Sequence, residues 1–204
     1  MRSAHKLAHN ESRLPTTEEI RKNYVPYLEA VIEETLRFSH IVPIILREAI
    51  VDAHLLGYPI PKGTQVWFLS NGPSYVEPAF DVAESKRSEG ESRSAVRCGV
   101  WAASDVREFK PERFLAMAPI PYEKPMTEKE VYLPLSGPNL PFGAGRRGCF
   151  GRNLAWLEMR IVITLLVWYF EFLDVGEKLG GMDVIDRATE VPRNCYVMLK
   201  KIEL

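Results

Sequence analysis

The chain has 204 residues, a formal net charge of -1 and 46% hydrophobic residues. This length and apolar content suffice for one domain with a real core, and they exclude a disordered chain. The near-neutral charge gives no sign of a nucleic-acid partner, which would need a basic patch or stripe. The three cysteines, Cys98, Cys149 and Cys195, are odd in number and widely spaced, so we expect a reducing, intracellular compartment and no disulfide framework.

The N-terminal residues 1–15 are polar, and we expect them to be disordered. Helices are predicted over residues 16–38. Thr16 and Glu19 have the spacing of a capping box, which begins a short helix. Pro26 ends that helix and opens the next one. The second helix is predicted to be amphipathic, because apolar residues recur at helical spacing: Leu28, Val31, Ile32 and Leu36.

Glu34 and Arg37 are three residues apart, so they share a face of this predicted helix. Helical geometry places both of them away from the apolar stripe. Their spacing alone therefore indicates an exposed ion pair, which is typically worth less than ~1 kcal/mol.

A small antiparallel β-sheet is predicted over residues 47–70, because a turn at Pro61-Lys62-Gly63 precedes a β-rich run at 64–69. Residues 81–99 combine low apolarity with mixed charge, and we expect a solvated, mobile insertion loop there. Residues 115–140 are proline-rich and are expected to be irregular. A long apolar helix is predicted over 152–170, and a β-hairpin region over 171–204 has strands at 170–175 and 195–200.

Residues 141–151 hold four glycines and one cysteine, directly before the long helix. Glycines at this density let the backbone fold tightly and approach a ligand closely. The helix N-terminus and nearby arginines favour the thiolate of Cys149, which suits a metal ligand or a nucleophile. An inert buried thiol is the alternative for a lone cysteine.

Phe142, Gly145, Arg147, Cys149 and Gly151 reproduce the spacing F-x-x-G-x-R-x-C-x-G. This loop resembles the haem-binding loop of the cytochrome P450 family. The resemblance implies haem b, that is iron protoporphyrin IX, with Cys149 as the axial ligand of its iron. The residues that it implies for cofactor binding are Phe142, Gly143, Gly145, Arg147, Cys149, Gly151 and Arg47.

Two further motifs resemble the same family. Glu34 and Arg37 match its E-x-x-R motif, and residues 109–114 contain its P-E-R-F motif with Arg113. The resemblance implies one buried network in which Glu34 lies between Arg37 and Arg113. It also implies that the apolar segment before the small sheet, which by itself suits ordinary core, borders the substrate pocket through Ile41, Val42, Ile44 and Ile45.

The implied fold is mainly α with small antiparallel β-sheets (α+β), so that residues 1–204 form the C-terminal part of the cytochrome P450 fold. The implied activity is a monooxygenase of the eukaryotic microsomal type, which inserts one oxygen atom of O₂ into a small organic substrate. Electrons would come from NADPH through a partner reductase. We expect this C-terminal fragment to be inactive alone and identify no catalytic residue, because the family's distal helix would precede residue 1.

Two alternatives remain at this stage. Some relatives of the family rearrange or dehydrate substrates without a reductase, and a truncated product could be non-catalytic. The longest apolar run, residues 161–170, is too short for a membrane span, which takes roughly 20 residues. We therefore expect membrane association only through an N-terminal segment outside this chain, with the full-length relative at the endoplasmic reticulum membrane.

Overall fold

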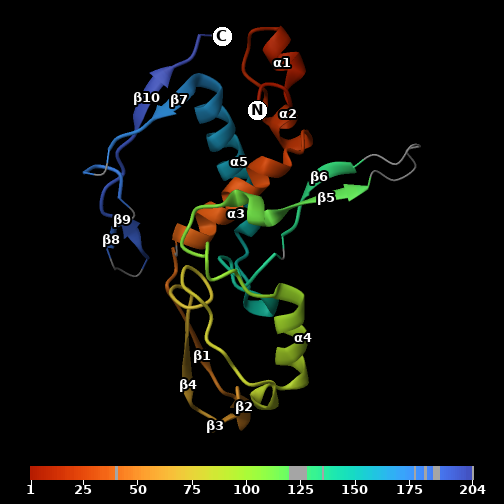
Figure 1. Cartoon of the computed structure of the whole chain (residues 1–204), viewed down its shortest axis with the longest axis vertical. Helices are drawn as coiled ribbons and strands as arrows, with labels where there is room; N and C mark the ends of the chain where they lie inside the picture. The colour runs from red at the N-terminus through yellow and green to blue at the C-terminus, as the bar shows by residue number, and fades with distance from the viewer. Residues whose placement is uncertain are drawn as a thin grey trace.

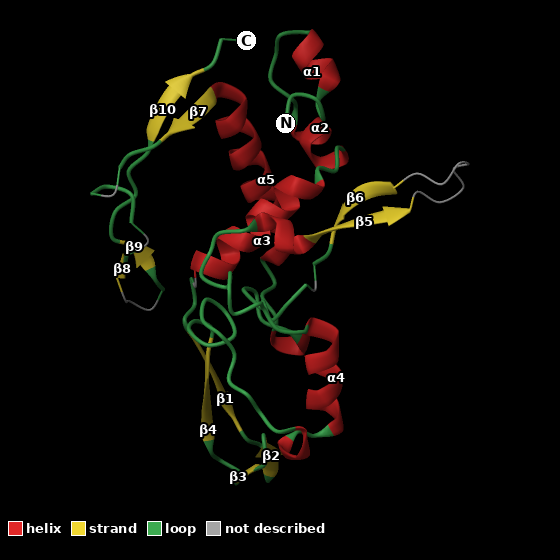
Figure 2. Cartoon of the chain, in the orientation of Figure 1, coloured by secondary structure: helices red, strands yellow, loops and turns green. Residues whose placement is uncertain are grey.

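The computed structural model describes residues 1–39, 41–119, 128–134, 136–176, 178–181, 183–185 and 189–203. Helices and two-stranded antiparallel sheets make up the regular structure of these residues (Figure 2). The predicted fold class, α+β, is confirmed.

Helix α3 (Pro26–Ser39) lies at the centre of the molecule, with α5 (Arg152–Tyr169) crossing beside it (Figure 1). Pro26 opens α3, as the sequence predicts. The apolar stripe of α3 forms the centre of the core through Leu28, Ile32 and Leu36. Partly buried side chains pack against this stripe from the N-terminus, the glycine loop and α5: Met1, Val25, Phe142, Trp156, Met159 and Ile163.

The expectation of disorder over residues 1–15 is wrong. This segment contains α1 (Lys6–Asn10), and Ala8 is fully buried. The rings of His5 and His9 both pack edge-on against Trp168 near the end of α5. The polar composition of the segment concealed this packing, because its partner lies more than 150 positions away in the chain.

Helix α2 (Thr17–Lys22) begins at the predicted capping box. The Glu19 N–H donates to the Thr16 hydroxyl at 3.2 Å, and the Thr16 N–H donates to the Glu19 carboxylate at 2.7 Å. Two of the N–H groups that a helix N-terminus leaves without partners are thus satisfied.

Each small sheet consists of two antiparallel strands, which are not always consecutive in the chain. In the region of the predicted sheet, β1 (Ile44–Glu48) pairs with β4 (Gln65–Leu69), and β2 (Ala53–Leu55) pairs with β3 (Tyr58–Ile60). The first strand therefore begins three residues earlier than the predicted boundary at 47. Near the C-terminus, β7 (Phe170–Leu173) pairs with β10 (Met198–Lys201). The last strand therefore begins three residues later than the predicted strand at 195–200, and Cys195 lies before it.

Two further strand pairs complete the β-structure of the described residues. The expectation of an irregular segment over 115–140 is wrong, because β5 (Leu115–Pro119) pairs with β6 (Glu128–Tyr132); residues 120–127 lie outside the described part. Between β7 and β10, β8 (Val184–Ile185) pairs with β9 (Val191–Pro192). Residues 186–188, between these two strands, also lie outside the described part of the chain.

The insertion at 81–99 is not the loop that its composition indicates. It contains a 3₁₀ turn, η1 (Glu84–Lys86), and α4 (Glu89–Cys98), which begins at a second capping box between Ser88 and Glu91. No residue of α4 is buried, which agrees with the prediction of a solvated segment. The capping box stabilises the helix that the composition did not indicate. The Glu91 carboxylate also accepts from the Leu56 N–H at 3.2 Å, which ties α4 to the β2–β3 hairpin.

Gly137 precedes the glycine loop and lies against the ring of Trp101. A Cβ atom at Gly137 would lie 2.1 Å from that ring, and the residue has a φ of +104°. Trp101 in turn packs edge-on against Phe114 of η2 (Pro111–Phe114), with ring centroids 5.4 Å apart. The absence of a side chain at Gly137 therefore lets Trp101 join two distant segments.

We predict that Gly137→Ala lowers the free energy of unfolding more than Gly63→Ala does. Gly63 also has a positive φ, +85°, but nothing lies within 4 Å of its hypothetical Cβ. The Gly63 variant should cost about 1–3 kcal/mol, because it carries backbone strain alone. Gly137→Ala adds the clash with Trp101, and chemical denaturation measures the difference. Equal costs would show that the Trp101 contact contributes nothing.

Candidate cofactor site

The glycine loop folds back on itself before α5. The Cys149 N–H donates to the Phe142 carbonyl at 2.7 Å, and the Gly148 N–H donates to the Gly145 carbonyl at 3.1 Å across a 3₁₀ turn, η3 (Gly145–Arg147). These bonds close the loop and leave the Cys149 side chain exposed. The thiol therefore stands at the end of a closed loop, two residues before Gly151, the N-cap of α5.

Gly143 and Gly145 take left-handed backbone conformations, with φ values of +68° and +63°. Side chains rarely adopt such values, so the fold of the loop requires glycine at these two positions. Gly151 plays a different part: a Cβ there would lie 3.8 Å from the Cys149 sulfur, at ordinary contact distance.

A cavity of about 490 Å³ lies beside the cysteine. Its walls come from the end of α3, from residues 41–47 and from the glycine loop, and its lining is mainly apolar. This volume is within the range of small-molecule and cofactor sites. It brings together most of the residues that the sequence singles out: Ile41, Val42, Ile44, Ile45, Arg47, Phe142, Gly143, Arg147 and Cys149. Gly145 and Gly151 belong to the loop but do not line the cavity.

Two arginines line the same cavity from different segments. Arg47 is on β1, where its guanidinium donates to the Leu46 carbonyl at 2.7 Å, and Arg147 is in the turn η3. Both side chains are exposed. The cavity thus combines apolar walls, one thiol and two planar cations, which suit carboxylate groups of a ligand.

The β8–β9 hairpin lies next to the cavity wall. The Glu190 N–H donates to the Ile41 carbonyl at 3.2 Å, and the Asn71 side-chain amide donates to the Glu190 carboxylate at 3.1 Å. Glu190 is buried, with 8% of its surface exposed. This hairpin therefore holds the backbone of a residue that faces the cavity.

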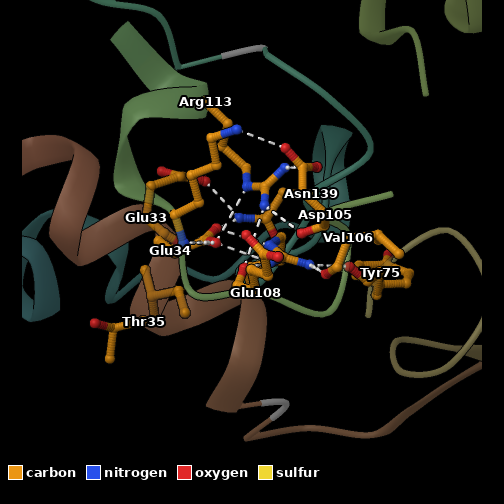
Figure 3. A network of polar contacts seen from close by, with 12 residues as sticks. Glu33, Glu34, Thr35, Tyr75, Asp105, Val106, Glu108, Arg113 and Asn139 are labelled. Atoms are coloured by element: carbon orange, nitrogen blue, oxygen red, sulfur yellow. Dashed lines mark hydrogen bonds and ion pairs between the residues drawn. The ribbon is translucent and has the colours of Figure 1, made fainter. Parts of the chain in front are cut away.

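The Glu34 carboxylate contacts two arginines, one of which, Arg113, is labelled beside it in Figure 3. The carboxylate accepts from Arg37 at 2.7 and 2.8 Å and from the Arg113 Nε at 3.1 Å. Glu34 and Arg37 are completely buried, and 7% of the Arg113 side chain is exposed. The structure thus joins these three residues, although helical periodicity alone placed two of them at the surface.

The remaining donors of this network are also satisfied. Arg37 donates to the carbonyls of Tyr75, Val106 (2.8 Å) and Glu108 (3.1 Å), and Glu34 accepts from the Lys110 N–H at 2.7 Å. Arg113 also pairs with Asp105 at 3.2 Å. A buried network stabilises a structure only when its polar groups all have hydrogen-bond partners. Here most of those partners lie in the segment 105–113, so the network joins α3 to that segment.

Sequence reasoning missed a second set of buried carboxylates on α3. Glu29 and Glu33 expose only 2% and 4% of their surface. Glu33 accepts from the Tyr132 hydroxyl at 2.6 Å and from the Asn139 amide at 2.8 Å. Glu29 accepts from the Trp156 indole at 2.5 Å and lies 2.6 Å from the Arg160 Nε, in an ion pair. These contacts join α3 to β6, to the segment just before the glycine loop and to α5.

Burial raises the pKa of Glu33 above its ordinary value, although the hydrogen bonds from Tyr132 and Asn139 oppose the shift. Burial also raises the pKa of Tyr132, and its hydrogen bond to Glu33 acts in the same direction. The spacing of Glu29 and Glu33, four residues apart beside Leu28 and Ile32, was the available signal. It could not reveal burial, because the donors lie about a hundred residues away.

The residues present fit a haem held by one thiolate. A thiolate is a soft ligand that suits iron, and the two arginines could pair with carboxylate groups at the edge of the macrocycle. Within the described part of the chain, no group of three or more His, Cys, Asp or Glu side chains could hold a metal ion. Across the same residues, no helix is long and apolar enough to cross a membrane.

An exposed thiol on a glycine loop thus lies beside a mainly apolar cavity that two arginines line. The family model described as cytochrome P450 matches residues 6–84 and 100–180. The chain therefore belongs to the cytochrome P450 family. The match leaves out residues 85–99, the segment that contains α4.

The chain is similar to several fungal proteins. It is 40% identical to a cytochrome P450 monooxygenase, TRI13, of Fusarium sporotrichioides, covering 100% of this chain and 36% of the relative. It is 36% identical to a cytochrome P450 monooxygenase of the Hps1-dma1 cluster of Dothistroma septosporum, covering 98% and 65%. It is 42% identical to the cytochrome P450 monooxygenase xilC of Penicillium crustosum, covering 96% and 32%. The chain thus spans between about a third and two thirds of these relatives.

We predict that Glu34→Ala and Arg113→Ala each lower the free energy of unfolding by about 3–5 kcal/mol, because each leaves a buried charge without its partner. The double variant should cost much less than the sum of the two, which chemical denaturation of all four proteins would measure. The matched control is Arg107→Ala in the exposed pair with Glu77, expected to cost less than ~1 kcal/mol. Additive costs for Glu34 and Arg113 would mean that the two do not interact.

We predict that Glu33 makes stability depend on pH. Its folded pKa is raised above the ordinary 4.5, so its contribution is fully present below about pH 4.5 and is lost as the pH rises through the folded pKa. Glu33→Gln removes this loss, so the stability of the variant relative to the native protein should increase with pH. Glu130→Gln, at an exposed position on β6, is the control and should leave the profile unchanged. Identical profiles for the Glu33 variant and the native protein would contradict the prediction.

Proposed function

We propose that this chain supplies the cysteine-ligand side of a haem-thiolate monooxygenase. The reaction is the insertion of one oxygen atom of O₂ into a small organic substrate, with electrons from NADPH through a partner reductase. One observation carries the proposal: Cys149, two arginines and the apolar residues of the 41–46 segment line one cavity. Membership of the cytochrome P450 family supports the same chemistry.

Three residues that line the cavity would bind the haem in this proposal. Cys149 would hold the iron, and it lies two residues before Gly151, the N-cap of α5. Arg147 and Arg47 would pair with the propionates. When bound, haem iron held by a thiolate activates O₂, because the thiolate pushes electron density toward O–O cleavage.

Packing keeps the ligand loop in place. The Phe142 ring lies 6.3 Å from the Trp156 ring and contacts the Leu28–Ile32–Leu36 core, so the loop is anchored on its inner side. The apolar residues Ile41, Val42 and Ile44 form the wall that a substrate would contact. Each of these three residues exposes between 38% and 52% of its surface, so all three are available for that contact.

A reductase would approach the face that carries the ligand loop. Arg146 and Arg152 flank Cys149 there and are exposed. The basic pair Arg21 and Lys22 is less suited, because both side chains already form ion pairs with Glu18, at 2.9 and 3.1 Å. We therefore assign the reductase-facing role to the arginines next to the cysteine.

We predict that Cys149→Ser abolishes the thiolate-type spectrum of the reduced carbon monoxide complex in the haem-loaded, full-length protein, because a serine hydroxyl cannot replace the thiolate. Cys98→Ser and Cys195→Ser are the matched controls and should leave the spectrum unchanged. A thiolate-type spectrum that survives in the Cys149 variant would refute the assignment of the ligand.

Product assays then separate the alternatives. A monooxygenase needs O₂, NADPH and a reductase for turnover, whereas a rearranging or dehydrating relative forms product without them. Turnover that persists when NADPH and the reductase are omitted would favour the second class.

A further inference from the structure

We propose that Glu33 is a positioning residue for the cysteine loop, acting through Asn139. This inference rests on the proposed function, because it concerns how the ligand Cys149 is held. Asn139 lies two residues before Pro141, where the loop begins, and it lines the cavity next to Leu140 and Phe142. Its placement therefore fixes the backbone that leads into the ligand loop.

The contact between Glu33 and Asn139 is double. The Asn139 side-chain amide donates to the Glu33 carboxylate at 2.8 Å and to the Glu33 carbonyl at 3.4 Å. The second carboxylate oxygen of Glu33 accepts from the Tyr132 hydroxyl at 2.6 Å. Both oxygens of the carboxylate are thus engaged, and the side chain has a defined orientation toward the loop.

The segment that follows the loop is attached to the same helix. Glu29, one turn before Glu33 on α3, accepts from the Trp156 indole in the second turn of α5. The segments on both sides of the loop that carries Cys149 are therefore bonded to one face of α3. The backbone bond from Cys149 to Phe142 closes the loop between these segments, so the backbone of Cys149 is held between them.

Stability alone does not explain a carboxylate at this place. Burying an ionised carboxylate is costly, and well-packed apolar residues often give equal or greater stability. The two side chains that donate to Glu33 are both uncharged, and the favourable charge of Arg152 does not offset burial, so the pKa of Glu33 stays raised. Two acceptor oxygens in a fixed plane do, however, orient a specific donor, and residues behind a metal ligand commonly act in this way.

The test uses the haem-loaded, full-length protein with three variants, Glu33→Leu, Glu33→Gln and Asn139→Ala. The readouts are the thiolate-type fraction of the reduced carbon monoxide spectrum and the rate of haem loss to an acceptor protein. Glu33→Leu and Asn139→Ala should weaken haem retention about 10–100-fold and lower the thiolate-type fraction. Glu33→Gln should preserve both, because its amide oxygen still accepts from Asn139.

The double variant Glu33→Leu with Asn139→Ala should be no worse than Glu33→Leu alone, since both act through one contact. Asn139 is only half-buried, so its variant remains informative if Glu33→Leu fails to fold. Ile20→Ala is the control for general destabilisation, because Ile20 is buried in α2 and does not line the cavity. It should lower the melting temperature and leave the spectrum of the folded protein unchanged.

The result that overturns the inference is a native spectrum and native haem retention in Asn139→Ala, or an equal loss of both in Ile20→Ala. The Cys149→Ser variant distinguishes a failure of this positioning role from a failure of the proposed function. If Cys149→Ser loses the thiolate-type spectrum while the Glu33 and Asn139 variants keep it, only the positioning role is wrong. If Cys149→Ser keeps the spectrum, the proposed ligand itself is wrong.

Discussion

Charged side chains buried on a single helix impose the main constraint on this structure. Helix α3 buries Glu29, Glu33, Glu34 and Arg37, and each of these groups needs hydrogen-bonding partners once it is removed from water. Many of those partners lie far away in the chain, as with Arg113 on Glu34 and Trp156 on Glu29, which are 79 and 127 positions away. Satisfying them brings η2, β6, the glycine loop and α5 around α3, where the apolar stripe then forms the core.

Two pairs of charged residues on α3 serve different parts of the molecule. Glu34 and Arg37 bind the backbone and side chains of the segment 105–113, which includes most of the P-E-R-F motif. Glu29 and Glu33 bind the segments that precede and follow the loop that presents Cys149. The end of the same helix contributes Leu36 and Ser39 to the cavity wall, so one element connects the core, the ligand loop and the cavity.

Local chemistry accounts for the elements that lie outside this arrangement. Helix α4 has no buried residue and falls in the segment that the cytochrome P450 family model does not match. It begins at a capping box, and its Glu91 also binds the turn between β2 and β3. A few side-chain-to-backbone bonds are thus enough to order a polar insertion against a hairpin.

The sequence by itself determined the features that depend on neighbours in the chain: the capping box at Thr16, the start of α3 at Pro26, its apolar stripe and the cysteine loop with its left-handed glycines. It also contained the motifs from which the family could be recognised. Only the tertiary structure decided that Glu29 and Glu33 are buried, that His5 and His9 pack on Trp168, and that residues 115–119 pair with residues 128–132. Each of these outcomes depends on contacts between distant segments, and helical or strand periodicity carries no information about a partner a hundred residues away.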